Sequence, residues 1–150
     1  MNAKKIYLSG FETCSKDYFT IIQKMRKLCN KYGFIGICYE GVDDSEEEFF
    51  INKIKAIERS DILIANLNFF RGDNIWDTTA FEIGYAYAKE KPIYGYISDM
   101  RSLKEKIGMK YSKDIIKETT VPISLLISMS TTIIKGDLEQ CLKFIYNVNK

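Results

Sequence analysis

The chain has 150 residues, of which 46% are hydrophobic and 28% charged, and its formal net charge is +2. This length predicts one domain, residues 1–150, with a real core. The charges are interspersed, so we expect neither a nucleic-acid nor a membrane-surface partner. The chain has no histidine, which excludes Ser-His and Cys-His catalysis.

The four cysteines show no C-x-x-C spacing, so a metal site of the zinc type is not expected. They are Cys14, Cys29, Cys38 and Cys141. The start of the chain lacks the long apolar region of a signal peptide. The sequence contains no run of about 18 apolar residues, so no membrane span is predicted. We therefore expect a cytoplasmic protein with free thiols.

In the first third of the chain, residues 4–9 form a β-rich run that ends in Gly10, which predicts a strand and a turn. Helical spacing of apolar residues follows over residues 15–32, with Ser15 as the predicted N-cap and Gly33 as the stop. Residues 34–39 predict a second strand.

In the middle third, Ser45 and Glu48 form a capping-box pattern that predicts a helix to about residue 59. Residues 61–67 are almost continuously apolar, which is typical of a central parallel strand covered on both faces. A helix of small and aromatic residues is predicted over 79–89, and a fourth strand over 93–97.

The last third is less regular. The charged segment 103–118 predicts part helix and part loop. The apolar segment 121–133 is interpreted as a helix, although its Ser and Thr content also suits a strand. An amphipathic helix over 137–146 follows Gly136.

Strand and helix alternate along the chain, which predicts an α/β fold: a doubly wound, flavodoxin-like parallel sheet of about five strands in a three-layer α/β/α arrangement. Ligands in such sheets bind at the carboxyl ends of the strands. The loops expected there are residues 9–14, 39–44, 66–79 and 98–101.

Two features within these loops have competing interpretations. The segment around Gly10 lacks the G-x-G-x-x-G pattern, so a dinucleotide site is disfavoured, and a turn glycine competes with a backbone that a ligand approaches. Thr79 and Glu82 repeat the capping-box pattern. On the residues alone, capping is favoured over a second role for Glu82, in which a carboxylate near a helix start acts as a nucleophile in glycosyl chemistry.

Three fragments, KIYLSG, ERSDILIANLNFFRG and TTAFEIGYAYAKEKPIYGY, together resemble the nucleoside 2-deoxyribosyltransferase family. The resemblance implies that Glu82 attacks the anomeric carbon of a 2′-deoxynucleoside and that a second base then takes the sugar. It implies a hydrogen bond from Tyr7 to this nucleophile and no cofactor. It also implies small-molecule nucleosides and nucleobases as partners, and a homo-oligomer.

The chain departs from the family pattern at three places. The family reads D-x-G-T before A-F-E, with the Asp protonating the leaving base; here Trp76 occupies that position and Asp77 comes one residue later. A family Asp or Asn falls near Lys53, and the family's N-L-M segment corresponds to the segment that begins at Ser124. These departures bear on the substrate and on the choice between transfer and hydrolysis.

The predicted site therefore has two parts. The catalytic residues are Glu82, Tyr7 and Asp77. The substrate-binding residues are Gly10, Phe11, Phe69, Arg71 and Trp76; the aromatic ones suit stacking on a base and suit a core equally. The predicted function is a deoxyribosyltransferase. The alternatives are an N-glycosidase acting on nucleosides or their 5′-monophosphates, and a nucleotide-binding protein without turnover.

Overall fold

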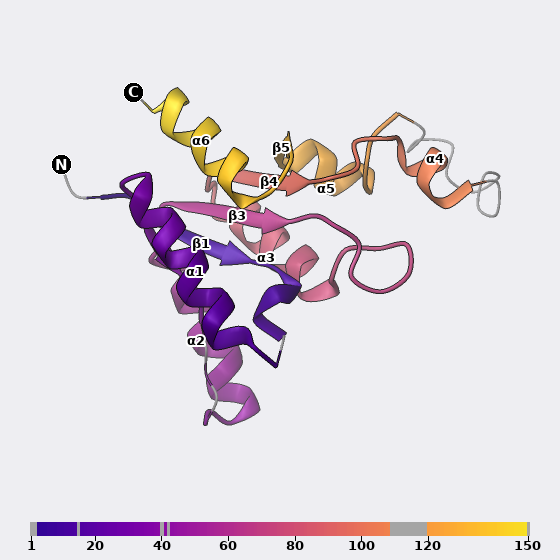
Figure 1. Cartoon of the computed structure of the whole chain (residues 1–150). Coiled ribbons are helices and arrows are strands. Elements are labelled where there is room, and N and C mark those ends of the chain that lie inside the picture. Colours follow the sequence, from indigo (N-terminus) through magenta and orange to yellow (C-terminus); the bar gives the residue numbers. More distant parts are fainter. Residues whose placement is uncertain (1–2, 15, 40, 42, 109–119, 150) are drawn as a thin grey trace.

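The computed structural model describes residues 3–14, 16–39, 41, 43–108 and 120–149 (Figure 1). Its centre is a sheet of five parallel strands in the order β2-β1-β3-β4-β5. The strands are β1 (Lys5–Ser9), β2 (Ile35–Ile37), β3 (Ile62–Asn66), β4 (Ile93–Ile97) and β5 (Thr132–Lys135). The prediction of a flavodoxin-like sheet of about five parallel strands is confirmed.

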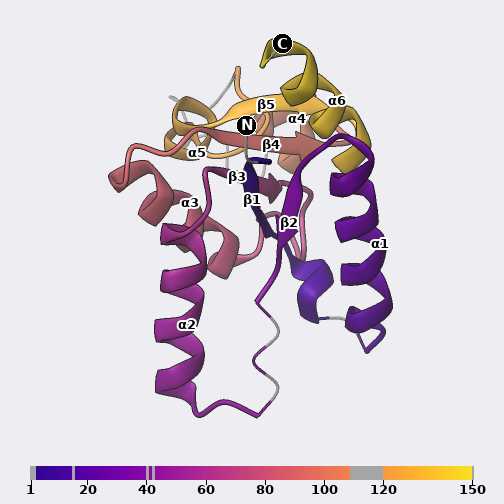
Figure 2. The same ribbon diagram turned by 90° about the vertical axis from the view of Figure 1, so that its left-hand side faces the viewer.

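Helices cover both faces of the sheet, as Figure 2 shows. One face carries α1 (Tyr18–Lys31) and α6 (Leu138–Val148), and the other carries α2 (Glu46–Glu58), α3 (Asp77–Ala88) and α5 (Leu125–Ser130). Two short helices lie near the carboxyl edge of the sheet, the 3-10 helix η1 (Phe11–Cys14) and α4 (Leu103–Ile107). No helix among these is long and apolar enough to cross a bilayer.

Alternation along the strands sorts their side chains between two cores. In β1, Ile6 and Leu8 pack against α1 and α6, whereas Tyr7 packs on the α2 and α3 side. Side chains two residues apart on a strand share a face. Ser9 therefore lies on the same side as Tyr7, at the carboxyl end of the strand.

The capping box predicted for α2 is confirmed. The Ser45 hydroxyl accepts the backbone N–H of Glu48 at 3.3 Å, and the Glu48 carboxylate accepts the N–H of Ser45 at 2.9 Å. The helix ends where the pattern places it, with Arg59 as its C-cap.

The same pattern at Thr79 and Glu82 does not form a capping box, so that prediction is wrong. Helix α3 begins two residues earlier, at Asp77, and Trp76 is its N-cap. The Asp77 carboxylate accepts the N–H of Thr78 at 2.8 Å, which satisfies a first-turn donor locally. Glu82 thus lies in the second turn, and its carboxylate is available to other partners.

The prediction of one helix over 121–133 is correct only for residues 125–130 and wrong at both ends. Helix α5 ends at Ser130 and strand β5 begins at Thr132. Thr132, Ile133 and Ile134 are β-branched residues that suit a pleated strand, and they pair with β4.

Helix α1 begins at Tyr18 with Asp17 as its N-cap, so the prediction of Ser15 as N-cap is wrong. Ser15 itself and residues 109–118 lie outside the described residues. Gly33 follows α1 with φ +78°, as a helix stop requires.

Candidate active site

The centre of the candidate site is the carboxylate of Glu82, which is only 2% exposed. The Tyr7 hydroxyl donates to Oε1 at 2.9 Å, and the Ser9 hydroxyl donates to Oε2 at 2.5 Å. Lys53 Nζ donates to Oε1 at 2.5 Å and forms an ion pair with it. These three donors compensate the cost of burying the carboxylate.

Strand β1 supplies two of these donors, and helix α2 supplies the third. Tyr7 and Ser9 point to the same face of β1, beneath the second turn of α3. Burial, followed by the negative charge of Glu82 and the hydrogen bond to it, raises the pKa of Tyr7 well above its ordinary value. The Tyr7 hydroxyl therefore stays protonated at neutral pH and remains a donor to Glu82.

A cavity of about 350 Å³ opens beside Glu82, between α2 and the first turns of α3. Most of its wall is apolar, with a few polar groups at one side, a composition that suits a small organic ligand. The lining residues are Phe49, Phe50, Lys53, Ile54, Ile57, Asp77, Thr78, Phe81 and Glu82.

Besides Glu82 and Tyr7, the structure brings two more of the predicted residues close to this centre. Asp77 lines the same cavity as Glu82, although its side chain is exposed. The Trp76 ring does not line the cavity, but its centroid is 5.6 Å from Lys53 Nζ. Both roles stay predictions.

Phe11 and Arg71 are connected to the site through Phe70. The rings of Phe11 and Phe70 stack with centroids 5.2 Å apart, and Phe70 lies 6.0 Å from Trp76. The Arg71 guanidinium is 4.9 Å from the centroid of Phe70. An aromatic wall thus extends from Trp76 toward η1 and presents ring faces that suit stacking.

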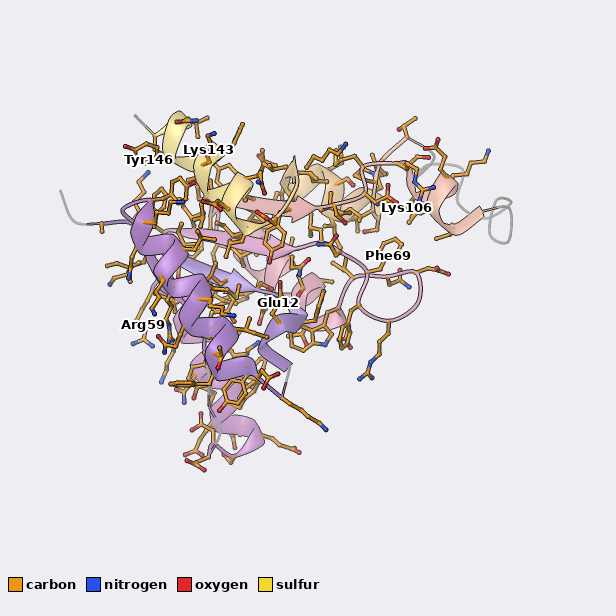
Figure 3. The ribbon with its side chains drawn as sticks, viewed as in Figure 1. Glu12, Arg59, Phe69, Lys106, Lys143 and Tyr146 are labelled. Carbon is orange, nitrogen blue, oxygen red and sulfur yellow. The ribbon has the colours of Figure 1, made fainter. Side chains whose placement is uncertain are left out.

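Phe69 lies elsewhere. Its ring centroid is 5.2 Å from Lys106 Nζ (Figure 3). It lines a second cavity of about 370 Å³ with Leu103 and Ile123, and Asp77 lines both cavities. The structure does not bring Phe69 to the Glu82 cavity.

Gly10 is buried directly after β1, and its lack of a side chain has a packing reason. A Cβ atom at this position would lie 2.1 Å from Glu12 Oε2 and 2.9 Å from Asn66 Cβ. The close packing supports the interpretation as a turn glycine. Its contact with a ligand stays a prediction.

Sequence reasoning missed Ser9, and it treated Lys53 only as a departure from the family. Period-2 alternation in β1 would have found Ser9, since it shares a face with Tyr7. Phe49, Lys53 and Ile57 recur every four residues on α2 and so share a helix face. All three line the cavity.

Within the described ranges, no three His, Cys, Asp or Glu side chains gather in a way that could hold a metal ion. A held carboxylate with a cation beside it, on the wall of an apolar cavity, can attack an electrophilic carbon and exchange a proton with the group that leaves.

Fold and site together define a flavodoxin-like α/β domain with a tyrosine-held carboxylate at the carboxyl edge of its sheet. The sequence profile of the nucleoside 2-deoxyribosyltransferase family matches residues 6–126, and the chain belongs to that family. A sequence search among curated proteins gives no match.

Solved structures of similar fold include two deoxyribosyltransferases and one N-glycosidase. A 2-desoxiribosyltransferase from Leishmania mexicana has a TM-score of 0.81 at 22% identity, covering 96% of this chain and 97% of that one. A 2-deoxyribosyltransferase from Bacillus psychrosaccharolyticus has a TM-score of 0.61 at 18% identity, covering 95% and 90%. A CMP N-glycosidase from Clostridium botulinum has a TM-score of 0.54 at 16% identity, covering 98% and 100%. At these identities the likeness shows the fold.

Proposed function

We propose that this protein is a nucleoside 2-deoxyribosyltransferase, which cleaves the N-glycosidic bond of 2′-deoxynucleosides and transfers the sugar to another nucleobase. The observation that carries the proposal is Glu82, buried yet held by Tyr7, Ser9 and Lys53 on the wall of a cavity. Membership of the nucleoside 2-deoxyribosyltransferase family supports deoxynucleosides as the substrate class.

In the proposed reaction, a carboxylate oxygen of Glu82 forms a bond to the anomeric carbon C1′. The C1′–N bond breaks, its electron pair passes to the base nitrogen, and the base leaves with a proton. The incoming base then attacks C1′, its N–H proton passes to the group that protonated the leaving base, and the C1′–O bond breaks with its electron pair returning to the Glu82 carboxylate. Two displacements at one carbon retain the configuration. Tyr7 orients the carboxylate by its hydrogen bond, and Asp77 is the proton donor that the sequence suggests.

Hydrolysis is the second candidate function. The family's acid position is occupied by Trp76, and Asp77 is exposed at the start of α3. One of the solved structures of similar fold is that of a CMP N-glycosidase. In this alternative, water takes the place of the incoming base, and the substrate is a nucleoside or its 5′-monophosphate.

The test mixes purified protein with deoxyuridine, with and without adenine, and follows the products by chromatography. Transfer predicts deoxyadenosine that appears only with adenine. Hydrolysis predicts uracil and free deoxyribose at the same rate in both mixtures. A nucleotide-binding protein without turnover would raise its melting temperature with ligand and form no product, which would contradict both enzyme functions.

We also propose that the chain forms a homo-oligomer through α3 and α5, which pack side by side. Leu126, Met129 and Tyr87 are 83%, 70% and 64% exposed, and all three border one cavity of about 520 Å³. Exposed apolar surface of this kind marks association sites. Light scattering should give a mass above that of one chain, and a Leu126→Glu variant should lower it. The single domain and the cytoplasmic location stay predictions from the sequence.

A further inference from the structure

We propose that Lys53, and not Asp77, donates the proton to the leaving base. This inference rests on the proposed function and adds a residue to it. Lys53 comes from α2, its side chain is 13% exposed, and its Nζ lies 2.5 Å from Glu82 Oε1. It is the one cationic side chain among the described residues that line the cavity.

The hydrogen bonds of Glu82 leave a place for the attack. A carboxylate offers about four lone-pair positions. In the described part of the chain, Tyr7 and Lys53 occupy the two on Oε1, and Ser9 occupies one on Oε2. The remaining position on Oε2 can attack C1′ while Lys53 stays bound to Oε1.

Lys53 also has N–H donors that its hydrogen bond to Glu82 does not use. An ammonium group carries three N–H donors, and Glu82 is its only hydrogen-bond acceptor in the described part of the chain. The ring centroids of Phe49 and Trp76 lie 5.5 Å and 5.6 Å from Nζ. A base stacked on either ring would come within reach of the remaining N–H groups.

The balance of charge across the step favours proton transfer from Lys53. Before the attack, the Lys53 cation and the Glu82 anion neutralise each other. The attack turns Glu82 into a neutral ester, and an unchanged Lys53 would then be a cation in a largely apolar cavity without its counter-charge, which is costly. If the proton moves from Nζ to the base nitrogen as the C1′–N bond breaks, both charges disappear in the same step.

The reverse step uses the same two groups. The neutral amine of Lys53 accepts the N–H proton of the incoming base, or a proton of water, as that group bonds to C1′. The ester bond breaks, and its electron pair returns to the Glu82 carboxylate. The Lys53–Glu82 ion pair is then restored.

The other polar groups at the site are less suited to donation. Asp77 is exposed, and its carboxylate accepts the backbone N–H of Thr78. The Tyr7 hydroxyl is buried and donates to Glu82.

The test compares two donors in the full-length protein. One is deoxyuridine, whose base needs a proton, and the other is 4-nitrophenyl 2-deoxyriboside, whose leaving group departs as an anion. In Lys53→Arg the ion pair is kept, but a guanidinium does not release its proton. We expect its kcat for deoxyuridine to fall at least about 100-fold, with at most a few-fold change for the 4-nitrophenyl donor. Lys53→Gln should show the same difference between donors.

The matched control is Lys55→Arg, an exposed position on the same helix, which should leave both rates unchanged. Equal losses on both donors in Lys53→Arg, or a rate on deoxyuridine within about threefold of wild type, would show that Lys53 only positions Glu82 and would overturn the inference. If Lys53→Arg melts early, Lys53→Gln decides by the same comparison. Wild-type protein that cleaves neither donor would instead contradict the proposed function.

Discussion

Two carboxylates lie near the carboxyl edge of the sheet on opposite faces, and each accepts a hydrogen bond from a strand tyrosine. Glu82 accepts from Tyr7 of β1, on the α2 and α3 side. Glu12, labelled in Figure 3, accepts from Tyr96 of β4 at 2.7 Å, on the α1 and α6 side. The Asn66 amide is a second donor to Glu12.

Their surroundings differ in charge. Glu82 has the Lys53 cation at 2.5 Å and faces a largely apolar cavity. Glu12 has only neutral donors among the described residues, and its Oε2 atom is buried without a partner there. A tyrosine–carboxylate hydrogen bond is thus a structural connection in both places. Glu12 also borders a cavity of about 350 Å³, so the Lys53 cation on Oε1 is what distinguishes the surroundings of Glu82.

The largest effect is expected from removing one carboxylate or the other. Glu82→Gln keeps the shape of the side chain but replaces the carboxylate by a neutral amide, a far weaker nucleophile, so kcat should fall at least about 10³-fold. Glu12→Gln should leave kcat within about threefold, since Glu12 faces the other side of the sheet. Chromatographic rates on deoxyuridine give both numbers. A Glu12→Gln variant as inactive as Glu82→Gln would contradict the proposal that only Glu82 is needed for turnover.

A smaller effect is expected from the two tyrosine hydroxyls. A hydrogen bond to a charged group contributes about 1.5–3 kcal/mol, so Tyr7→Phe should lower kcat about 10- to 100-fold if the bond orients Glu82 in the transition state. Tyr96→Phe removes the matching bond to Glu12 and should change stability without lowering kcat more than about threefold. Unchanged turnover in Tyr7→Phe would remove the role assigned to Tyr7.

The smallest effect concerns stability at high pH. Burial raises the pKa of Tyr7 far above its ordinary value of 10.0. Above pH 10 the unfolded chain loses this proton while the folded chain keeps it. The contribution of Tyr7 to the free energy of unfolding is therefore fully present below pH 10, and it falls by about 1.4 kcal/mol per pH unit above pH 10.

Urea unfolding of wild type and Tyr7→Phe between pH 9 and 11 measures this contribution, and the variant should show the shallower decline above pH 10. Burial also raises the pKa of Cys29 to about 11 and of Cys141 to about 12. These thiols add a decline of the same sign from about pH 9, but they do so in both proteins and cancel in the difference. Parallel curves would contradict the buried state of Tyr7.

Much of the fold could be predicted because its signals are local. Strand β4 was predicted with its observed bounds, and the Ser45–Glu48 box is present. The same pattern at Thr79 and Glu82 does not form a capping box, because residues distant in the sequence bind the carboxylate instead. Tyr7 and Lys53 donate hydrogen bonds to the Glu82 carboxylate that a capping box would use. Strand β5 was missed because the apolar segment around it carries no turn signal before Thr132.

The candidate site was predictable in part. The family fragments point to Glu82 and Tyr7, and the structure brings these two within hydrogen-bond distance. Lys53 lies 29 residues before Glu82 in the chain, and no spacing rule connects a lysine on one helix to a carboxylate on the next. Phe69 shows the opposite case, since it neighbours the site in sequence but packs beside Lys106.

The central claim is that Glu82 forms a covalent bond to the sugar, and mass spectrometry of quenched reactions tests it most directly. Protein mixed with deoxyuridine in the absence of an acceptor base is denatured within milliseconds, and its peptides are sequenced. The account predicts a peptide heavier by one deoxyribosyl unit, with the added mass on Glu82, and no such peptide from Glu82→Gln. Turnover without any adduct on Glu82, or an adduct that persists in Glu82→Gln, would contradict it.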